Sequence, residues 1–514
     1  MKKDINTTMY DFVLNSAEHT RGDALAFGNK RISFVEFTKE VDNVAGRLTA
    51  SGIGKGDCIA ICLPNIPQSV IAFYACSKIG AIASMVHPKT SPNEFEKQLK
   101  TTRPKLALLT EINYFAYKPL LEGVKIVFCS LITGKGFIGM KKAVEYTSVE
   151  SDGSNTAVYM HSGGTTGASK TVVLSHRSFN ALVLNLLESM QYPFDEHDTM
   201  LAILPLFHGF GLSAGVHMSL CSRMAAALVP VFKPKKVVSF MNKQKINVLS
   251  VIPRMMQKIL EEPSFSGEVV KRIRKLYVGG DNLNEKLRVA FNTKLKDEGS
   301  KCVVQQGYGL TEMGSVCVLN FAEQRPDSIG QALLNVDAKV VGEDMSEMPC
   351  GKAGELLFKS EQMMDGYLAD EETTKQSFVE IDGEKWLKTG DIVSMDKDGY
   401  IYFLDRKKRL IKISGMNVFP LEIEQSAKKL EEVLNCVATQ KNIEGKPFIC
   451  LYVVLKEGLE LDEKLKNKFS DYFEKTLSHW SVPKYFEAVS ELPHTNFGKV
   501  DFKEIEKLCN GDNK

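Results

Sequence analysis

The sequence lacks any run of apolar residues long enough to cross a membrane as a helix. Its longest candidates, residues 224–232 and 447–455, have the length of buried strands, whereas a membrane-spanning helix needs about 20 apolar residues. The first residues of the chain are also not followed by the apolar stretch of a secretory signal. We therefore expect a soluble, cytoplasmic protein without a transmembrane segment.

The sequence also lacks an excess of charge of one sign, clustered histidines and closely paired cysteines. The 65 Lys and Arg residues nearly balance the 63 Asp and Glu residues, so the net charge gives no indication of a nucleic acid as a partner. The nine His residues are scattered, and the eleven Cys residues form no Cys-x-x-Cys pair, which argues against a zinc site. The cysteines are typical of buried thiols in a reducing compartment.

The pattern of apolar residues predicts an α/β protein with more than one domain. A chain of 514 residues exceeds the usual size of a single domain. Segments with helical spacing alternate with short apolar runs, as in sheets that carry helices on both faces. The predicted helices are 34–50, 68–79, 179–190, 237–244 and 253–262, and the predicted strands are 58–63, 81–86, 106–110, 124–129, 171–174, 200–204, 247–252 and 276–278.

The pattern changes at about residue 327 and again at the basic residues 406–409. Short strands are expected at 339–341, 354–358, 392–394 and 400–404, and helices at 421–434 and 462–477. We therefore divide the chain into an N-terminal domain of residues 1–405, of which 327–405 form a β-rich subdomain, and a C-terminal domain of residues 406–514.

A loop rich in glycine and hydroxyl residues follows the apolar run 157–160. Residues 161–171 read His-Ser-Gly-Gly-Thr-Thr-Gly-Ala-Ser-Lys-Thr, and main-chain N–H groups, hydroxyls and a lysine can all donate to phosphate oxygens. The spacing approaches that of a P-loop, but Ser169 stands where the second glycine of a P-loop belongs, and the next residues favour a strand over a helix. The loop therefore predicts a phosphate-binding turn between two strands and disfavours a P-loop NTPase.

Three further polar segments lie far apart in the chain. Residues 305–312 read Gln-Gln-Gly-Tyr-Gly-Leu-Thr-Glu after a predicted strand at 302–304, residues 386–391 read Trp-Leu-Lys-Thr-Gly-Asp before another, and a Gly-Lys pair occupies positions 498–499. In this order, and together with the loop, they resemble the motifs of the adenylate-forming superfamily. That superfamily includes acyl-CoA synthetases, 4-coumarate–CoA ligases, beetle luciferases and adenylation domains. The resemblance extends from about residue 31 to residue 505.

The resemblance implies a fold and a reaction. The fold would be a large N-terminal domain of doubly wound sheets with a β-barrel-like subdomain, followed by a small, mobile α+β C-terminal domain. In the reaction a carboxylate attacks the α-phosphorus of ATP to give acyl-AMP and pyrophosphate, and a thiol then takes the acyl group. The implied cofactors are ATP, Mg²⁺ and CoA as co-substrate.

The same resemblance implies roles for individual residues. Glu312 and Thr166 would hold Mg²⁺, an oxygen-seeking cation, and Thr311 would donate to the α-phosphate. Lys499 would counter the negative charge that builds in the transition state of adenylation. The residues expected at ATP or AMP are Ser162, Gly163, Gly164, Thr165, Thr166, Gly167, Lys170, Gly280, Asp281, Gln306, Gly307, Tyr308, Gly309, Thr311, Asp391 and Arg406.

For the second half-reaction the resemblance implies another face of the C-terminal domain. Lys412 is expected there as a further catalytic residue, with Ser414 and Gly415 along the path of the thiol. Lys408 falls at the expected hinge, near residues 406–409, about which the C-terminal domain would rotate between the two half-reactions.

The acid itself is expected at His208, Gly209, Gly279 and Gly280. Residues 205–212 resemble the segment that lines the acid pocket of acyl- and aryl-CoA ligases, and they contain no aspartate to pair with a substrate ammonium. The glycines would leave room for a chain, which favours a fatty acid, with aromatic acids as an alternative. A ligase that loads the phosphopantetheine of a carrier protein would share every motif, so free CoA and a carrier protein both stay open. A scaffold without activity is disfavoured, and the motifs do not determine the oligomeric state.

Overall fold

The structure, a computed structural model, describes residues 4–17, 20, 22–131, 135–146, 152–162, 170–190, 194–320, 325, 327–413, 416–443, 446–493 and 500–510. The chain divides into two compact units. The first unit comprises Met1–Ser162, Ser169–Asp337 and Phe358–Leu387, and the second comprises Gly163–Ala168, Ala338–Leu357 and Lys388–Lys514. Among the described residues, no helix combines the length and the hydropathy that crossing a membrane requires. The prediction of an α/β fold with a large N-terminal and a small C-terminal part is confirmed.

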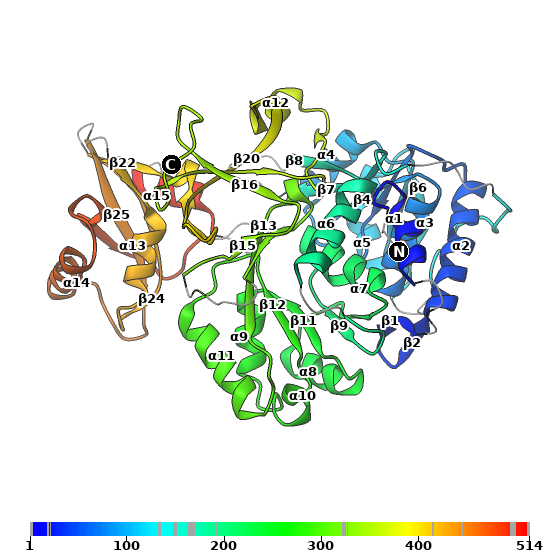
Figure 1. Cartoon of the computed structure of the whole chain (residues 1–514), viewed down its shortest axis with the longest axis horizontal. Helices are drawn as coiled ribbons and strands as arrows, with labels where there is room; N and C mark the ends of the chain where they lie inside the picture. The colour runs from blue at the N-terminus through cyan, green and yellow to red at the C-terminus, as the bar shows by residue number, and fades with distance from the viewer. Residues whose placement is uncertain are drawn as a thin grey trace. The chain divides into compact units, whose positions relative to one another are not determined.

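One large sheet of the first unit has the strand order β15-β14-β13-β12-β11-β9-β10-β1-β2 (Figure 1). Its strands are β1 (Asp23–Phe27), β2 (Lys30–Ser33), β9 (Thr199–Ala202), β10 (Ala225–Leu228), β11 (Val248–Val251), β12 (Lys275–Val278), β13 (Val304–Gly309), β14 (Val316–Leu319) and β15 (Gln331–Ala332). The central strands pair in parallel, and antiparallel pairing begins at β2 on one side and β14 on the other. Short, almost wholly buried strands of this kind are typical of sheets covered on both faces.

Four helices bury one face of this sheet. They are α8 (Pro234–Lys243), α9 (Pro253–Leu260), α10 (Glu268–Lys271) and α11 (Glu285–Asp297), which gather together in Figure 1. Their buried side chains, such as Met241 and Phe291, join Leu249 and Leu276 of the strands in one apolar core. The π-helix η2 (Phe210–His217) and helix α7 (Met218–Cys221) follow β9 in the chain.

A second sheet of the same unit has the order β18-β8-β7-β4-β3-β5-β6. Its strands are β3 (Cys58–Ile61), β4 (Ile82–Met85), β5 (Leu106–Leu109), β6 (Lys125–Phe128), β7 (Thr156–Ser162), β8 (Lys170–Ser175) and β18 (Gly366–Tyr367). The helices around it are α1 (Met9–Ala17), α2 (Phe34–Ala50), α3 (Pro67–Lys78), α4 (Pro92–Thr102), α5 (Glu111–Tyr117) with η1 (Lys118–Leu120), and α6 (His176–Ser189). The start of α2 shows how the sequence sets these elements: Ser33 and Glu36 form a capping box, which satisfies two N–H groups at the helix start. Helix α12 (Glu371–Ser377) follows β18.

An antiparallel sheet has the order β16-β17-β20-β19, and β21 also pairs with β20. Its strands are β16 (Asp337–Val341), β17 (Gly354–Lys359), β19 (Phe378–Ile381), β20 (Glu384–Met395) and β21 (Ile401–Arg406). The short helices η3 (Thr311–Met313) and η4 (Lys407–Arg409) begin after β13 and β21, respectively.

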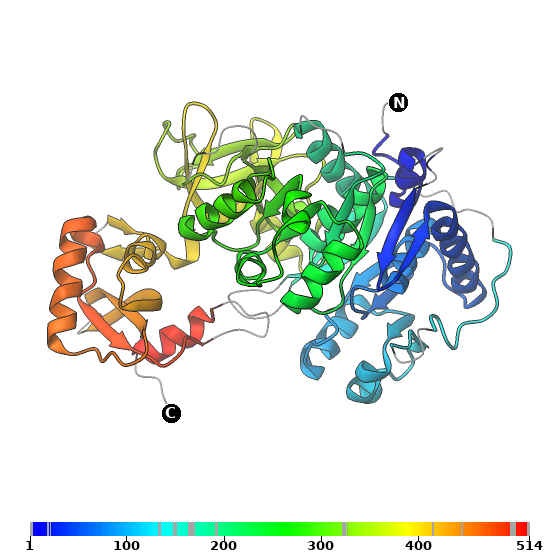
Figure 2. The ribbon, with the colours of Figure 1, turned by 90° about the horizontal axis from the view of Figure 1, so that it is seen from below.

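The C-terminal part of the second unit has its own sheet and two cores. Its elements are β22 (Ile411–Ile413), β23 (Met416–Val418), α13 (Pro420–Ala427), β24 (Val433–Ile443), β25 (Lys446–Leu455), α14 (Glu463–Thr476), η5 (His479–Ser481), β26 (Tyr485–Ala488) and α15 (Phe502–Asn510). Helices α13 and α14 pack on β24 and β25 through residues such as Ile423 and Phe469. Helix α15 packs through Ile505 on the alternate residues of the same strands, such as Tyr452. Figure 2 shows α15, in red, apart from α14, in orange-red.

Three predicted boundaries are wrong for reasons of tertiary pairing. The helix expected at 421–434 ends at Ala427, because Val433 already pairs with Leu455 in the sheet. The segment 305–309 was expected after a strand, but it lies in β13, which pairs with β12 on one side and β14 on the other. Residues 386–391 were expected before a strand and lie within β20. In each case pairing with neighbouring strands decides the conformation over local propensity.

Candidate active site

Strands β7 and β8 form the hairpin that carries the predicted phosphate loop. They are antiparallel, with Ser162 paired to Lys170, and the Ser162 hydroxyl donates to the Lys170 carbonyl oxygen over 3.3 Å. The strand predicted after the loop is therefore confirmed, in contrast to the helix of a P-loop. The residues expected to hold phosphate between them, Gly163, Gly164, Thr165, Thr166 and Gly167, lie outside the described residues.

Lys170 and Glu312, which are 142 positions apart in the sequence, meet the same tyrosine. The Lys170 ammonium lies 4.4 Å from the centre of the Tyr367 ring. The Tyr367 hydroxyl donates a 2.8 Å hydrogen bond to Oε1 of Glu312. The structure thus brings together two of the predicted nucleotide-site residues, through a third residue that the sequence analysis missed. The only local signal was a Gly-Tyr pair in a polar segment, which is too common to single out a site.

Main-chain bonds position this tyrosine. Strand β18 pairs with β8, so that Tyr367 lies opposite Val172, and the Leu368 N–H donates to the Thr171 carbonyl over 2.8 Å. Nearby, the Met364 N–H donates to the carbonyl of Glu312 over 2.8 Å. Burial, followed by the negative charge of Glu312, raises the pKa of Tyr367, so its hydroxyl keeps its proton and remains a donor at neutral pH.

The surroundings of Glu312 fit a magnesium ion. Within the described part of the chain Glu312 forms no ion pair with a basic side chain, and only Oε1 is engaged by Tyr367. The described residues also contain no cluster of three or more His, Cys, Asp or Glu side chains that could enclose a metal. Mg²⁺ is commonly held by one or two carboxylates together with substrate phosphates and water, and a single half-buried carboxylate suits that arrangement.

The other residues of the predicted 305–312 motif follow one another on β13 and η3. Gln306 pairs with Val278, Gly307 with Leu319 and Tyr308 with Val318. At Gly309 a Cβ atom would lie 2.0 Å from the Ser315 carbonyl oxygen, so only glycine fits there. Thr311 begins η3 and is half-buried. The rings of Tyr308 and Phe358 lie 6.4 Å apart.

The glycines expected at the acid come close to this motif. A Cβ atom on Gly209 would lie 2.1 Å from the Gly314 carbonyl oxygen, and one on Gly279 would lie 3.0 Å from the Gly307 carbonyl oxygen and 3.5 Å from the ring of Phe210. The backbones of the predicted acid segment and the predicted nucleotide segment are therefore in contact.

The remaining residues of this region lie on its exposed side. His208 is exposed, and its ring lies 4.7 Å from that of Phe207. The Phe207 ring in turn lies 4.1 Å from the His87 ring, tilted by 43°. Gly280 has a left-handed φ of 83°, and exposed Asp281 accepts a 2.8 Å bond from the Asn282 N–H. His87 was not predicted.

In the second unit, Asp391 and Arg406 are direct partners. They lie opposite each other on β20 and β21, and Nη1 of Arg406 is 2.9 Å from Oδ1 of Asp391. Beside them, buried Glu355 accepts from the Gly390 N–H over 3.2 Å and from the Lys407 ammonium over 2.7 Å. The two residues predicted at the ribose are thus brought together, and Glu355 supports the turn that carries them.

Lys408 lies between two anchored neighbours. On one side Lys407 pairs with Glu355, and on the other Arg409 pairs with Glu424 and lies 4.1 Å from the centre of the Phe502 ring. Exposed Lys412 pairs with Glu343 over 3.2 Å. The predicted residues Ser414, Gly415 and Lys499 lie outside the described residues.

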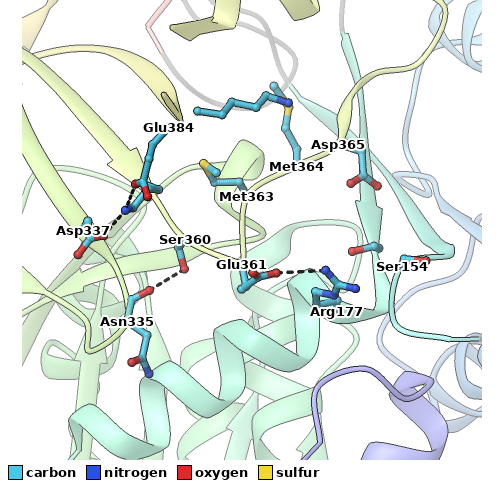
Figure 3. A pocket seen from close by; sticks show the side chains of 13 residues that line it. Ser154, Arg177, Asn335, Asp337, Ser360, Glu361, Met363, Met364, Asp365 and Glu384 are labelled. Atoms are coloured by element: carbon cyan, nitrogen blue, oxygen red, sulfur yellow. Dashed lines mark hydrogen bonds and ion pairs between the residues drawn. The ribbon is translucent and has the colours of Figure 1, made fainter. Parts of the chain in front are cut away.

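A cavity of about 800 Å³ lies elsewhere in the first unit (Figure 3). Ser175 and Arg177 line it, and Ser175 lies at the other end of strand β8 from Lys170. Met364, whose N–H donates to the Glu312 carbonyl, lines it too. Its charged side chains largely satisfy one another: Arg177 pairs with Glu361 over 3.4 Å, and Lys359 pairs with Asp337 over 3.0 Å. We therefore do not assign the nucleotide to this cavity.

Two family models match the chain. The model of the AMP-binding enzymes matches residues 14–368, and the model of the C-terminal domain of AMP-binding enzymes matches residues 422–499. The first match alone covers more than half of the chain.

Named relatives are similar over almost the whole length. The long-chain-fatty-acid–CoA ligase of Bacillus subtilis (strain 168) is 28% identical over 537 residues, covering 96% of this chain and 93% of that protein. The 4-coumarate–CoA ligase 2 of Nicotiana tabacum is 28% identical over 508 residues, covering 94% and 91%. Among solved structures, the O-succinylbenzoate coenzyme A synthetase of Bacillus subtilis in complex with ATP and magnesium ion has a TM-score of 0.83 at 25% identity, covering 98% of this chain and 100% of that chain.

Proposed function

The chain belongs to the family of AMP-binding enzymes, within the adenylate-forming superfamily, and from this premise we propose that it joins a fatty acid to CoA through an acyl-AMP intermediate. The observation that carries the proposal is the arrangement of Lys170 and Glu312 around Tyr367. A cation and a carboxylate that contact the same side chain suit a phosphate chain and its Mg²⁺.

In the first half-reaction an oxygen of the acid attacks the α-phosphorus of ATP. The bond between the α-phosphorus and the bridging oxygen breaks, and pyrophosphate leaves with the electron pair. Lys170 and the loop before it neutralise the leaving charge, and Thr311 donates to the α-phosphate. Glu312 and Thr166 would hold Mg²⁺, which when bound would supply further charge neutralisation on the phosphates. Lys499 approaches the reacting oxygens, while Asp391 and Arg406 bind the ribose.

In the second half-reaction the thiol sulfur of CoA attacks the acyl carbonyl, the thiol proton is lost, and AMP leaves. We propose that rotation about Lys408 removes Lys499 and presents Lys412, Ser414 and Gly415. The anchored neighbours of Lys408 support this proposal, because Lys407 and Arg409 pair with different elements, Glu355 on β17 and Glu424 on α13. A position whose two neighbours pair with different elements is a suitable place for a hinge.

The choice of a fatty acid rests on the residues that are expected to line the acid pocket. Gly209 and Gly279 let the predicted acid segment pack directly against the nucleotide motif, since carbonyl oxygens occupy the space that a side chain would fill at either glycine. The partly buried Phe210 ring adds an apolar surface. The relative named for long-chain fatty acids supports the same choice. The relative named for 4-coumarate supports an aromatic acid as the second candidate, and the neighbouring rings of Phe207 and His87 offer aromatic surfaces for it.

A screen for pyrophosphate release tests the proposal. The purified full-length protein receives ATP, Mg²⁺ and one acid at a time, from short- to long-chain fatty acids and 4-coumarate, with and without CoA. We expect pyrophosphate and AMP with fatty acids, and acyl-CoA when CoA is added. Pyrophosphate release with 4-coumarate but with no fatty acid would identify an aromatic acid as the substrate. Pyrophosphate release without acyl-CoA when CoA is present would rule out free CoA as the acceptor, and orthophosphate release independent of any acid would contradict the function.

A further inference from the structure

Tyr367 makes two contacts of different kinds with two charged groups of the candidate site. Its hydroxyl donates to Oε1 of Glu312, and the face of its ring receives the ammonium of Lys170. The first contact is a charge-assisted hydrogen bond, and the second is a cation–π contact.

The hydrogen bond constrains the carboxylate of Glu312. Because Tyr367 occupies Oε1, the carboxylate has a defined orientation, and Oε2 is left for another ligand. Residues that hydrogen-bond to a metal-ligating side chain commonly raise metal affinity by orienting that side chain. Main-chain bonds from Met364 to Glu312 and from Leu368 to Thr171 keep the donor in place.

The ring acts on Lys170 in a complementary way. An aromatic face attracts a cation without engaging its N–H donors, whereas a carboxylate would engage them. Within the part of the chain that the structure describes, Lys170 forms no ion pair with an acidic side chain. The ring can therefore hold the ammonium in place while its N–H groups remain for phosphate oxygens.

We propose that Tyr367 is a positioning residue that prepares Glu312 for Mg²⁺ with its hydroxyl and Lys170 for the phosphates of ATP with its ring. The proposal rests on the proposed function for the assignment of Mg²⁺ and ATP to these two residues. It adds that one side chain outside the recognised motifs controls both groups, and that its two contacts can be removed one at a time.

The chain offers a matched control at Tyr10. Its hydroxyl donates to Asp42 over 3.2 Å, and the Lys78 ammonium lies 4.6 Å from its ring centre. The same two contacts therefore occur on α1, where no residue was assigned to the nucleotide. An effect that comes only from losing such a pair of contacts will therefore appear at Tyr10 as well.

The experiment is calorimetric titration of ATP into the full-length protein, once with saturating Mg²⁺ and once with EDTA. The variants are Tyr367→Phe, Tyr367→Leu, Tyr10→Phe and Tyr10→Leu. For Tyr367→Phe we expect an affinity for Mg·ATP about 5- to 10-fold lower, with the affinity for metal-free ATP unchanged. For Tyr367→Leu we expect both affinities to fall, because the ring contact is lost as well. Both Tyr10 variants should bind like the wild type.

The outcomes separate this proposal from the function. Equal binding of Mg·ATP by Tyr367→Phe and the wild type would overturn the role of the hydroxyl, and an equal loss with and without Mg²⁺ in that variant would indicate a structural role only. Unchanged metal-free binding by Tyr367→Leu would overturn the role of the ring, and Tyr367→Met replaces it if the leucine variant does not fold. A wild type that binds Mg·ATP but releases no pyrophosphate with any acid refutes the proposed function, while the comparison of variants still decides the role of Tyr367.

Discussion

Arg406 approaches a carboxylate that is completely buried. Its Nη1 lies 2.9 Å from Oδ1 of Asp391, whose side chain is 0% exposed, whereas the arginine side chain is 48% exposed. The two residues face each other across paired strands. A buried carboxylate needs a partner of opposite charge, which the guanidinium supplies, and strand pairing fixes the position of Asp391 on β20.

Asp391→Asn should lower the affinity for ATP by about tenfold or more, because bonds from ribose hydroxyls to a carboxylate are charge-assisted. Titration calorimetry with Mg·ATP measures the change. Asp198→Asn is the control, since Asp198 is also buried (1% exposed) and pairs over 2.6 Å with Arg274, which is 49% exposed. Loss of affinity in the control variant alone, or equal loss in both variants, would contradict the role of Asp391 at the ribose.

Lys499→Ala should slow the formation of acyl-AMP by about 100-fold or more, as removal of one stabilising donor does in other sites of developing charge. Transfer from preformed acyl-AMP to CoA should stay within a few-fold of the wild type. Pyrophosphate exchange and thioester formation measure the two steps. Lys507→Ala removes a lysine paired with Glu504 on the same chain segment and should affect neither step; equal losses of both steps in Lys499→Ala would refute its assignment.

Lys408→Pro should impair the second half-reaction and leave the first nearly intact, which is the reverse of the effect expected for Lys499→Ala. Proline restricts φ to about −65°, so rotation at this position is hindered, and we expect near-normal acyl-AMP formation with acyl transfer to CoA reduced by at least about tenfold. Lys408→Ala removes the charge but leaves the backbone free, and it should retain both activities. Normal acyl transfer in the proline variant would place the hinge elsewhere.

Gly279→Ala should change the preference for chain length. The added Cβ would lie 3.0 Å from the Gly307 carbonyl oxygen and 3.5 Å from the Phe210 ring, so the packing between the predicted acid segment and the nucleotide motif must adjust. We expect kcat/KM to fall more for long than for short fatty acids. Gly54→Ala, at a position where a Cβ meets nothing within 4 Å, is the control. The same relative loss for all acids would show that Gly279 does not line the chain.

Acid should weaken the fold through His161. Burial lowers the pKa of His161 to about 4, while its two ring nitrogens lie 3.1 Å from the hydroxyls of Ser84 and Thr171. In the unfolded chain a histidine binds its proton at about pH 6.5, so between pH 6.5 and pH 4 the unfolded state binds more protons and stability falls as the pH falls. Urea unfolding at pH 7 and pH 5 should therefore give a lower midpoint at pH 5.

The variant His161→Gln separates this histidine from the other titrating groups. Its midpoint should decrease less between pH 7 and pH 5 than that of the wild type, whatever its stability at pH 7. The expected difference in unfolding free energy is about 2 kcal/mol for one buried histidine. An identical pH dependence of the two proteins would show that His161 is not the group that titrates.

Much of the fold could be predicted because its elements have strong local signals. Residues 34–50 were predicted as a helix from their apolar spacing, and α2 has these bounds. In the structure the capping box of Ser33 and Glu36 fixes its start. The strand after the phosphate loop was predicted from its β-branched residues, and β8 confirms it. The assignments of individual residues to ATP, the acid and CoA stay predictions, which the experiments above test.

The sequence by itself determined the α/β alternation, the family and the separate polar motifs, since these depend on residues close together in the chain. Only the tertiary structure decided that Tyr367 joins Lys170 to Glu312, that β13 extends through Gly309, and that α13 ends at Ala427. These features depend on strand pairing and on contacts between residues far apart in sequence. Local propensity and spacing contain no information about which distant strand will supply the partner.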